Sequence, residues 1–385
     1  MGSSRSLAPA MVEMLSTKIL MTADAVGGVW TYALDLCHGL TAQGAEIALV
    51  TFGDPASPDQ RAEVRTLPGV TFVETDFKLE WMDDPWPEVD AAGTFLQRFA
   101  GGWCPDLVHL NGYAHAALDW PVPVAVVAHS CVYTWWQAVH GRWPPDDAYA
   151  EYGRRVHAGL ERADAVAAPT AAMLQGLAGA YGWRRPGVVI PNGGRPLHGS
   201  SRCKQPHIAA AGRIWDVAKG IATLERIAPR LRWPVHVAGD HAGGAASARP
   251  SVENLRWAGR LSRAAVGPFL AESAIFAAPA LYEPFGLAIL EAARAGCCLV
   301  LSDLPSLREN WDGAAEFVPA RDLEGWACTL NALTLDDDRR NRLAAAARTR
   351  ARRFSVDAMV TGYLSLYRAL RANTAPWHRS EGAMA

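Results

Sequence analysis

Short runs of apolar residues recur along the chain, and most are followed by a loop and then by a longer stretch with helical spacing. The first such unit has an apolar run at 18–21, a loop with a glycine pair, and then residues 29–40, which are apolar at Trp30, Leu34 and Leu40. Buried parallel strands joined by amphipathic helices produce this alternation. The pattern therefore predicts an α/β protein with doubly wound parallel sheets.

The predicted strands are short and rich in apolar residues. They comprise residues 18–21, 45–52, 70–73, 106–110, 122–128, 163–168, 188–190, 207–211, 235–238, 255–258, 274–279 and 297–302. Helices are predicted over residues 29–40, 221–231, 287–296 and 356–370, and within residues 322–353. Residues 356–370 have the apolar spacing of a packed helix face. Residues 134–147, which are rich in aromatic side chains, are expected to form an irregular loop.

The chain is long enough for two domains, because 385 residues exceed the usual size of a single hydrophobic core. The clearest linker is a Pro-, Gly- and Ser-rich run at residues 190–201, which places the boundary after residue 195. The predicted parts are a disordered tail at 1–16, a first domain at 17–195, a second domain at 196–355, a C-terminal helix at 356–372 and a disordered tail at 373–385.

The composition excludes some classes of partner. A formal net charge of −2 without a dense basic run argues against nucleic acid. No segment approaches the roughly 18 apolar residues of a membrane span, although peripheral contact with a membrane stays open. The seven cysteines are odd in number and include no Cys-x-x-Cys pair, which indicates a cytoplasmic protein without a disulfide framework.

The segment from Glu283 to Glu291 carries the clearest chemical signal. It lies between a predicted strand and a predicted helix and begins Glu-Pro-Phe-Gly-Leu. Phe285, Gly286 and Leu287 would lie at the helix N-terminus, where free N–H groups and the macrodipole favour an anion. The glycine would let that anion approach closely. The two carboxylates could then accept hydrogen bonds from hydroxyl groups on either side of a phosphate.

Two cations in the second domain suit the same anion. Arg213 and Lys219 stand around a predicted strand-to-helix turn, within the pattern Gly-Arg-x5-Lys-Gly. Two fixed cations can neutralise the charge that grows on a leaving diphosphate, although such a pair is often only a solvated surface feature. Together with the Glu-Pro-Phe-Gly-Leu segment and the second glutamate eight positions on, this pair resembles the signature of the family 4 retaining glycosyltransferases.

The resemblance implies the GT-B fold and a donor site. In this fold two Rossmann-like, doubly wound domains face a central cleft, and a C-terminal helix crosses back onto the first domain. The resemblance implies that the diphosphate of the nucleotide sugar is bound by Arg213, Lys219 and the amides of Phe285, Gly286 and Leu287, with Gly27 and Gly28 beside it. It also implies that Glu291 binds ribose and that Glu283 binds the sugar hydroxyls. Arg260 and Leu261 would contact the base.

Acceptor candidates follow the predicted strands of the first domain, because ligands collect at the carboxyl ends of parallel strands. His129 follows one strand. A histidine in such a place is commonly structural, but the resemblance implies that it faces the reacting sugar and the acceptor as a catalytic residue. Asn111, Tyr133, Trp135 and Trp136 are further candidates on the acceptor side.

The expected activity is transfer of a sugar from a nucleoside diphosphate donor, expected to be a UDP-sugar, to an acceptor hydroxyl with retention of configuration. The nucleotide sugar is a substrate, so no cofactor is expected. The sequence shows no strand-terminal Asp-x-Asp motif of the kind that metal-dependent transferases use, so no metal is expected. The acceptor stays open among a sugar, a lipid-linked sugar and another small molecule.

Three alternatives remain at the level of sequence. A nucleotide-sugar epimerase of the same architecture would use the same donor without an acceptor. A nicotinamide-dependent oxidoreductase would need a Gly-x-Gly-x-x-Gly pattern, which does not follow the first predicted strand. A non-catalytic sugar-binding protein would leave both cations and both glutamates of the signature unexplained.

Overall fold

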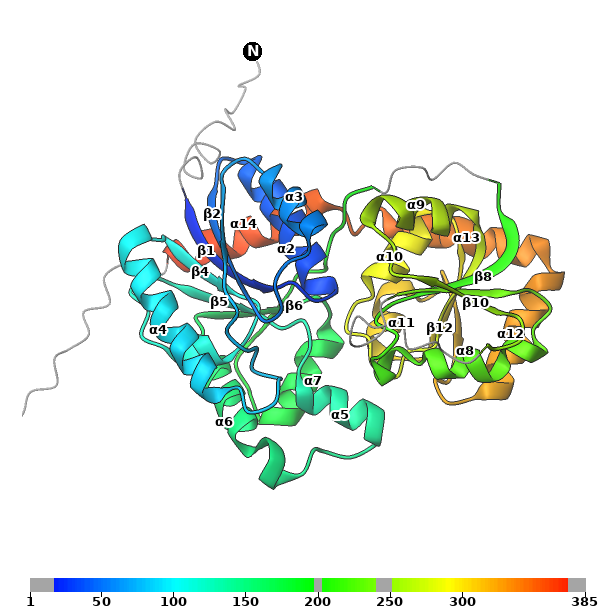
Figure 1. Ribbon diagram of the computed structural model, residues 1–385, viewed down its shortest axis with the longest axis horizontal. Coiled ribbons are helices and arrows are strands. Elements are labelled where there is room, and N and C mark those ends of the chain that lie inside the picture. The colour runs from blue at the N-terminus through cyan, green and yellow to red at the C-terminus, as the bar shows by residue number, and fades with distance from the viewer. Residues whose placement is uncertain (1–16, 197–202, 240–250, 373–385) are drawn as a thin grey trace, which may run out of the picture.

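Two α/β domains lie side by side in the computed structural model, which describes residues 17–196, 203–239 and 251–372 (Figure 1). The two tails predicted at residues 1–16 and 373–385 lie outside the described residues. Each domain has helices on both faces of a parallel sheet. The predicted pair of doubly wound sheets is therefore confirmed.

The first domain contains a seven-stranded parallel sheet with the order β3-β2-β1-β4-β5-β6-β7. Its strands are β1 (Lys18–Asp24), β2 (Glu46–Phe52), β3 (Val70–Glu74), β4 (Leu107–Leu110), β5 (Val124–Val127), β6 (Ala165–Ala168) and β7 (Val188–Val189). Its helical segments are α2 (Gly28–Thr41), α3 (Pro58–Arg65), α4 (Trp86–Trp103), η1 (Ala114–Ala117), α5 (Val132–His140), α6 (Asp146–Arg162) and α7 (Ala171–Tyr181). The strand order reverses between β1 and β4, which creates a switch point where ligands of such sheets bind.

The second domain contains a six-stranded parallel sheet with the order β10-β9-β8-β11-β12-β13. Its strands are β8 (Gln205–Ala211), β9 (Val235–Ala238), β10 (Leu255–Gly259), β11 (Ser273–Ala278), β12 (Cys298–Ser302) and β13 (Glu316–Val318). Its helical segments are η2 (Val217–Lys219), α8 (Ile221–Ile227), η3 (Ala228–Arg230), α9 (Arg263–Glu272), α10 (Leu287–Arg294), α11 (Pro305–Trp311), α12 (Leu323–Leu335) and α13 (Asp337–Ala351). The strand order reverses between β8 and β11.

Every predicted strand is confirmed, with ends that differ by a few residues. β13 was not predicted, because a strand of three residues is too short to show a pattern. The irregular loop predicted over residues 134–147 is wrong, because α5 covers much of it. Sγ of Cys131 accepts the N–H of Thr134 at the start of this helix, and Gly141 ends it with φ at 70°. A cysteine cap carries no familiar sequence signal.

The C-terminal helix α14 (Val356–Ala372) returns to the first domain, as predicted (Figure 1). Its buried face includes Tyr363 and Tyr367 and packs into the cluster that contains β1 and α2. The two crossings of the chain between domains lie together, since Gly194 forms an isolated parallel bridge with Ser355. The boundary after residue 195 itself stays a prediction.

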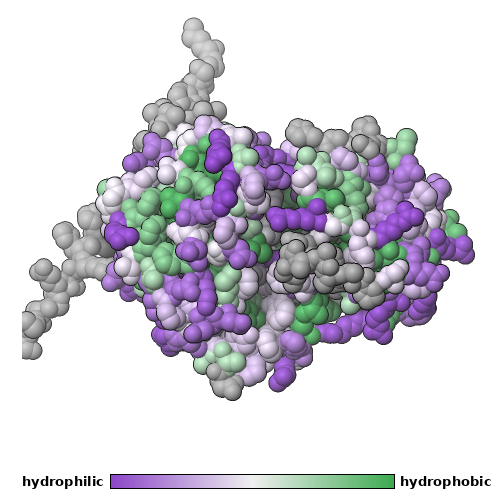
Figure 2. Space-filling view, in the orientation of Figure 1, coloured by the Kyte–Doolittle hydropathy of each residue, from purple (hydrophilic) through white to green (hydrophobic). Residues whose placement is uncertain are grey.

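Hydrophilic residues are distributed over both domains on the face shown in Figure 2. Within the described ranges, no helix has both the length and the apolar composition needed to cross a membrane.

Gly39 of α2 lies directly beneath α14. A Cβ at this position would lie 2.3 Å from Cγ2 of Val360 and 3.0 Å from Cγ1 of Val356. We expect Gly39→Ala to lower the free energy of unfolding by roughly 1–3 kcal/mol, because the added methyl group forces the two helices apart. Chemical and thermal unfolding measure the change.

A double-variant cycle tests the cause of this loss. Val360→Ala removes the closest methyl group, so Gly39→Ala should cost much less in that background. Gly101→Ala in α4 is the matched control, since a Cβ there would meet nothing within 4 Å. It should raise the stability by up to about 1 kcal/mol through helix propensity. A Gly39→Ala protein as stable as the parent would contradict the packing of α14.

Candidate active site

The carboxyl ends of the strands in the two sheets face one another. After β1, a Cβ at Gly27 would lie 3.0 Å from Nη1 of Arg213, which follows β8. After β6, Thr170 donates a 3.1 Å hydrogen bond to the carbonyl oxygen of Pro284, which follows β11. The two switch points therefore face one junction between the domains, here called the crevice, and parallel α/β sheets bind ligands at such places.

An ion pair joins two predicted donor-site residues across the second sheet. Nζ of Lys219, at the end of η2, lies 2.7 Å from Oε2 of Glu283 in the loop after β11. The two side chains are only 21% and 16% exposed, so water and salt screen their attraction weakly. Oγ of Ser306 donates to the Glu283 carbonyl oxygen at 2.6 Å and fixes the loop. The fold thus brings together the two charged motifs identified in the sequence.

The start of α10 has the conformation that the sequence predicts. Gly286 has φ at 88°, in the left-handed region that favours glycine, and the helix begins at Leu287. The ring of Phe285 is buried against Phe354, with ring centroids 5.5 Å apart, so its side chain serves packing. A Cβ at Gly28 would lie 3.6 Å from Cδ1 of Leu287. Gly28 therefore faces this helix start.

Arg213 lies between the glycine pair and Asp216. Its Nη2 is 2.8 Å from Oδ2 of Asp216, and its buried Nε has no hydrogen-bond partner among the described residues. Burial alone would raise the pKa of Asp216, but the hydrogen bond from Arg213 and the nearby charge of Lys219 lower it. Both predicted clamp cations therefore lie near one carboxylate. The structure places them together in the crevice, with donor capacity left on Arg213.

Glu291 of α10 lies beside a cluster of charges at the junction of the domains. Burial raises the pKa of Glu291 to about 7 against the opposing charge of Arg263, and the carboxylate of Asp35 raises it further. Asp35 is fully buried and accepts hydrogen bonds from Nε of Arg195 at 2.6 Å and from Nη2 of Arg263 at 2.9 Å. The charge of Glu291 therefore changes near neutral pH.

His129 and Asn111 form one hydrogen-bonded unit after β5 and β4. Nδ2 of Asn111 donates to the carbonyl oxygen of Thr22 at 2.7 Å, which orients the amide oxygen toward His129. Nε2 of His129 lies 2.8 Å from that oxygen and must carry the proton. Burial lowers the pKa of His129 to about 3, and the neighbouring His109 adds to the effect. His129 is therefore neutral near pH 7, with its tautomer fixed.

The aromatic acceptor candidates lie on α5 and point in different directions. Nε1 of Trp135 donates to Oδ1 of Asp216 at 3.2 Å and so reaches the second domain beside the clamp. The ring of Trp136 packs against Tyr149, and Oη of Tyr133 donates to the Tyr149 carbonyl oxygen at 3.1 Å. The structure brings Trp135 to the crevice and packs Tyr133 and Trp136 against the first domain. Their acceptor roles stay predictions.

Arg260 and Leu261 follow β10 at the carboxyl edge of the second sheet. Gly259 turns the chain with φ at 68°, and its carbonyl oxygen accepts the N–H of Gly239, which follows β9, at 2.9 Å. The two residues therefore stand at the edge that carries the clamp. Their contact with the base of the donor stays a prediction.

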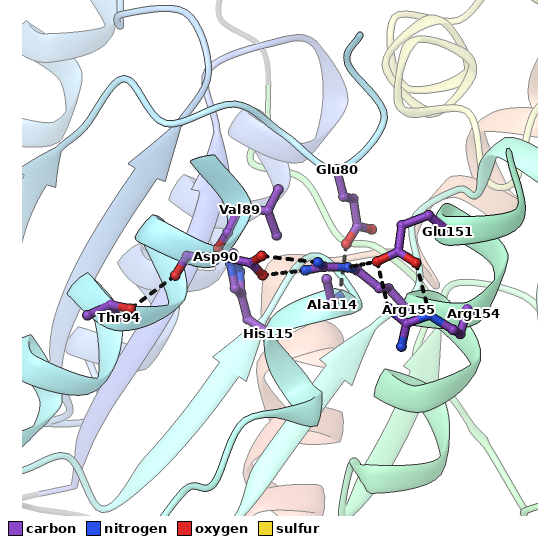
Figure 3. A network of polar contacts seen from close by, with 9 residues as sticks. All are labelled: Glu80, Val89, Asp90, Thr94, Ala114, His115, Glu151, Arg154 and Arg155. Carbon is purple, nitrogen blue, oxygen red and sulfur yellow. Dashed lines mark hydrogen bonds and ion pairs between the residues drawn. The ribbon is translucent and has the colours of Figure 1, made fainter. Parts of the chain in front are cut away.

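Glu80 supports the crevice and was missed at the level of sequence. This glutamate, in the loop after β3, accepts the N–H of Ala114 at 2.9 Å and holds the loop after β4 (Figure 3). Burial raises its pKa. Nearby, Arg155 of α6 pairs with Asp90 of α4 and donates to Glu151 at 2.6 Å (Figure 3). A single glutamate in a loop forms no motif, so no sequence signal could have found this contact.

Two aspartates at the crevice were also missed. Asp216 lies inside the Gly-Arg-x5-Lys-Gly motif and contacts Arg213 and Trp135. Asp24 ends β1 just before the glycine pair. Its place at the carboxyl end of the first strand was the signal that could have identified it.

Two family models match the chain, one over each sheet. The model "Glycosyltransferase Family 4" matches residues 26–194, and "Glycosyl transferases group 1" matches residues 205–336. The chain belongs to glycosyltransferase family 4. The matched ranges contain every predicted donor-site residue of this glycosyltransferase. The matches give no support to an epimerase or a nicotinamide oxidoreductase.

Curated relatives agree with the family. The D-inositol 3-phosphate glycosyltransferase of Xylanimonas cellulosilytica is 27% identical, and the aligned region covers 90% of this chain and 92% of the relative. The glycogen synthase of Mycobacterium tuberculosis strain H37Rv is also 27% identical, over 64% of each chain.

Solved structures share the fold. Sucrose-phosphate synthase from Thermosynechococcus elongatus superimposes with a TM-score of 0.76 at 17% identity, covering 93% of this chain and all of the other. Anabaena HepE in complex with UDP-glucose has a TM-score of 0.71 at 16% identity, covering 92% of this chain and all of the other. The predicted GT-B fold is confirmed.

The raised pKa of Glu291 predicts pH-dependent binding of the donor. If its carboxylate accepts ribose hydrogen bonds, binding should strengthen as the pH rises through 7 and the group ionises. We expect the dissociation constant of the preferred nucleotide sugar to fall about threefold to tenfold between pH 6 and pH 8. Calorimetry measures it, and an intact nucleotide sugar is the right probe because its diphosphate does not titrate in this range.

Glu291→Gln is the control for this pH dependence. The variant should bind the donor with an affinity that is flat over the same range. Because the folded pKa lies above the ordinary value of 4.5, the parent should also lose stability relative to Glu291→Gln as the pH rises from about 5 to 7. An equally steep pH dependence in the variant would assign the titration to another group.

Proposed function

We propose that this glycosyltransferase moves a sugar from a UDP-sugar to an acceptor hydroxyl with retention of configuration, in the cytoplasm. The observation that carries the proposal is that Arg213 and Lys219 lie near one carboxylate, Asp216, while Gly27 faces Arg213 and Gly28 faces the start of α10. Two cations and the free N–H groups of a helix N-terminus suit a diphosphate. The Anabaena neighbour, whose structure contains UDP-glucose, supports UDP as the nucleotide.

Each donor contact has a defined task in this proposal. The tasks are neutralisation of the leaving diphosphate by Arg213 and Lys219, binding of sugar hydroxyls by Glu283, binding of ribose by Glu291, and contact with the base at Arg260 and Leu261. Glu283 is well placed for its task because its ion pair with Lys219 holds the proposed sugar-binding carboxylate beside the proposed phosphate-binding cation. A bound UDP-sugar can satisfy both members of that pair.

The proposed stereochemistry follows from the weak basicity of His129. Inversion requires a side-chain base on the face opposite the leaving group. With a pKa of about 3, the imidazole of His129 holds a proton poorly near neutral pH. Its Nε2–H is already committed to Asn111. The leaving phosphate, held by Arg213 and Lys219, is the better acceptor for the proton of the acceptor hydroxyl. It lies on the face of the sugar ring from which it departs, so attack on that face retains the configuration.

The clamp predicts a large loss of turnover without a loss of fold. We expect Lys219→Ala and Arg213→Ala each to lower turnover by roughly 100- to 10,000-fold, because each removes a charge that stabilises the leaving diphosphate. Release of UDP and formation of glycosylated product from a panel of UDP-sugars measure turnover. Circular dichroism and the melting temperature report the fold.

Arg230→Ala is the matched control for the clamp. Arg230 pairs with Glu324 on the surface of the second domain, where both side chains are more than half exposed, so turnover should change less than twofold. The assays contain EDTA, because the proposal assigns charge neutralisation to the two cations. A folded double variant with the turnover of the parent would refute the clamp, and activity that needs added Mg²⁺ or Mn²⁺ would refute metal independence.

The anomeric configuration of the first product tests retention. An α-linked UDP-sugar should give an α-linked product, and His129→Ala should impair transfer without abolishing it, since the proton acceptor belongs to the substrate. Proton NMR of the product at early times gives the coupling constant of the anomeric proton. A β-anomeric coupling from an α-linked donor would overturn the proposed mechanism.

A further inference from the structure

Asp24 occupies the end of β1 at the switch point of the first sheet. Its Oδ1 accepts the N–H of Val26 at 2.8 Å, which closes the turn that leads to Gly27. Gly27 in turn lies against the guanidinium of Arg213, as the 3.0 Å separation from a Cβ there shows. The carboxylate therefore lies on the first-domain side of the crevice, close to the predicted diphosphate site.

The Asp24 carboxylate is available for a ligand. Val26 supplies its one hydrogen bond recorded among the described residues, whereas a carboxylate can accept about four. Burial raises the pKa of Asp24 to about 6, although the Val26 N–H and the charge of Arg213 lower it. Hydrogen bonds from the hydroxyl groups of a ligand would stabilise such a desolvated carboxylate.

Carboxylates gather at the carboxyl ends of β1, β2 and β3 in the first sheet. The segments that follow β1, β2 and β3, together with the last residues of β1 and β3, carry Asp24, Asp54, Glu74, Asp76, Glu80, Asp83 and Asp84. Lys78 is the one lysine or arginine within these described segments. Its Nζ donates to the carbonyl oxygens of Asp83 and Asp84 and pairs with Glu88.

The other basic groups near this edge are paired or neutral. Arg61 of α3 pairs with Glu74 at 2.9 Å, so that carboxylate is already compensated. Arg195, which follows β7, is held by Asp35 and Glu63. His129, after β5, is neutral near pH 7 because burial lowers its pKa. The cations Arg213 and Lys219 lie on the second domain, each paired with a carboxylate of that domain, whereas the ends of β1 to β3 on the first domain carry more carboxylates than cations. A phosphate on the acceptor would meet like charge on the first domain.

We propose that Asp24 binds a hydroxyl group of the acceptor and that the acceptor is an uncharged sugar or polyol. This inference rests on the proposed function and defines the substrate class of the same site. Asp24 accepts a hydrogen bond from a hydroxyl next to the reacting one and so positions the acceptor beside the diphosphate. The acidic edge excludes acceptors that carry a phosphate near the reacting hydroxyl.

The acceptor class is tested with the parent protein and its preferred UDP-sugar. Probes are glucose and myo-inositol, each compared with glucose 6-phosphate and D-inositol 3-phosphate, and a cell extract split by anion exchange into uncharged and anionic fractions. Mass spectrometry should find glycosylated products of uncharged probes or of the uncharged fraction. A product that forms only from phosphorylated probes or the anionic fraction overturns the proposal, as does hydrolysis of the donor without any product.

The role of Asp24 is tested with Asp24→Asn and Asp24→Ala. Each should raise the acceptor KM by about 10- to 100-fold, the loss expected for a hydrogen bond to a charged group. UDP affinity should change less than threefold. Asp106→Asn is the matched control, because Asp106 also accepts a backbone N–H at 2.8 Å, from Lys18, but precedes β4 at the opposite edge of the sheet.

The outcomes separate this inference from the proposed function. An unchanged acceptor KM in both Asp24 variants overturns the role of Asp24, and so does an equal rise in Asp106→Asn, which would show a structural effect. A parent protein that binds no UDP-sugar contradicts the proposed function itself. A parent that binds and transfers, but to a phosphorylated acceptor, contradicts the inference alone.

Discussion

The buried carboxylate of Asp35 is the point on which the arrangement of the two domains depends. It lies on α2 of the first domain and accepts hydrogen bonds from Arg195 in the linker and Arg263 in the second domain. A fully buried carboxylate is costly unless it is paired and hydrogen-bonded, so moving the domains apart here would leave an unpaired charge. Arg294 of α10 adds donors to the carbonyl oxygens of the linker at Gly194. The junction is therefore fixed at the base of the crevice.

The other side of the crevice is joined by contacts with helix ends of the first domain. Glu309 of α11 accepts the N–H groups of Ala171 and Ala172 at the start of α7, at 2.8 and 3.1 Å. Arg321 donates to the carbonyl oxygen of Val139 near the end of α5. In each case the charge of the second-domain residue is opposite to the partial charge of the helix terminus. These contacts and the Asp35 cluster together join the two domains at two separate places.

The sequence predicted the order of the elements well because buried parallel strands leave strong apolar runs. It also predicted a glycine at the start of α10, where Gly286 takes a left-handed conformation. The donor contacts themselves are implied by the family resemblance and stay predictions. Glu80 and Asp216 were missed because their contacts with Ala114 and Trp135 join distant segments. Asp24 lies at the carboxyl end of the first strand, and this place could have identified it. Tyr133 looked like an acceptor candidate, but its hydroxyl group donates within the first domain. Side-chain direction on a helix cannot be read where the helix itself is mistaken for a loop.

The ion pair between Lys219 and Glu283 has a consequence for which molecules can occupy the crevice. Each charge already has a partner at 2.7 Å, so an incoming ligand competes with an internal one. An anion that binds Lys219 without a sugar leaves the Glu283 carboxylate without its partner. A neutral sugar alone offers Lys219 no negative charge to replace that carboxylate. Only a molecule with phosphate oxygens and hydroxyl groups a short distance apart compensates both partners at once. Under the proposed function, the ion pair therefore favours a molecule that carries both groups, and inorganic phosphate or a free sugar alone binds there weakly.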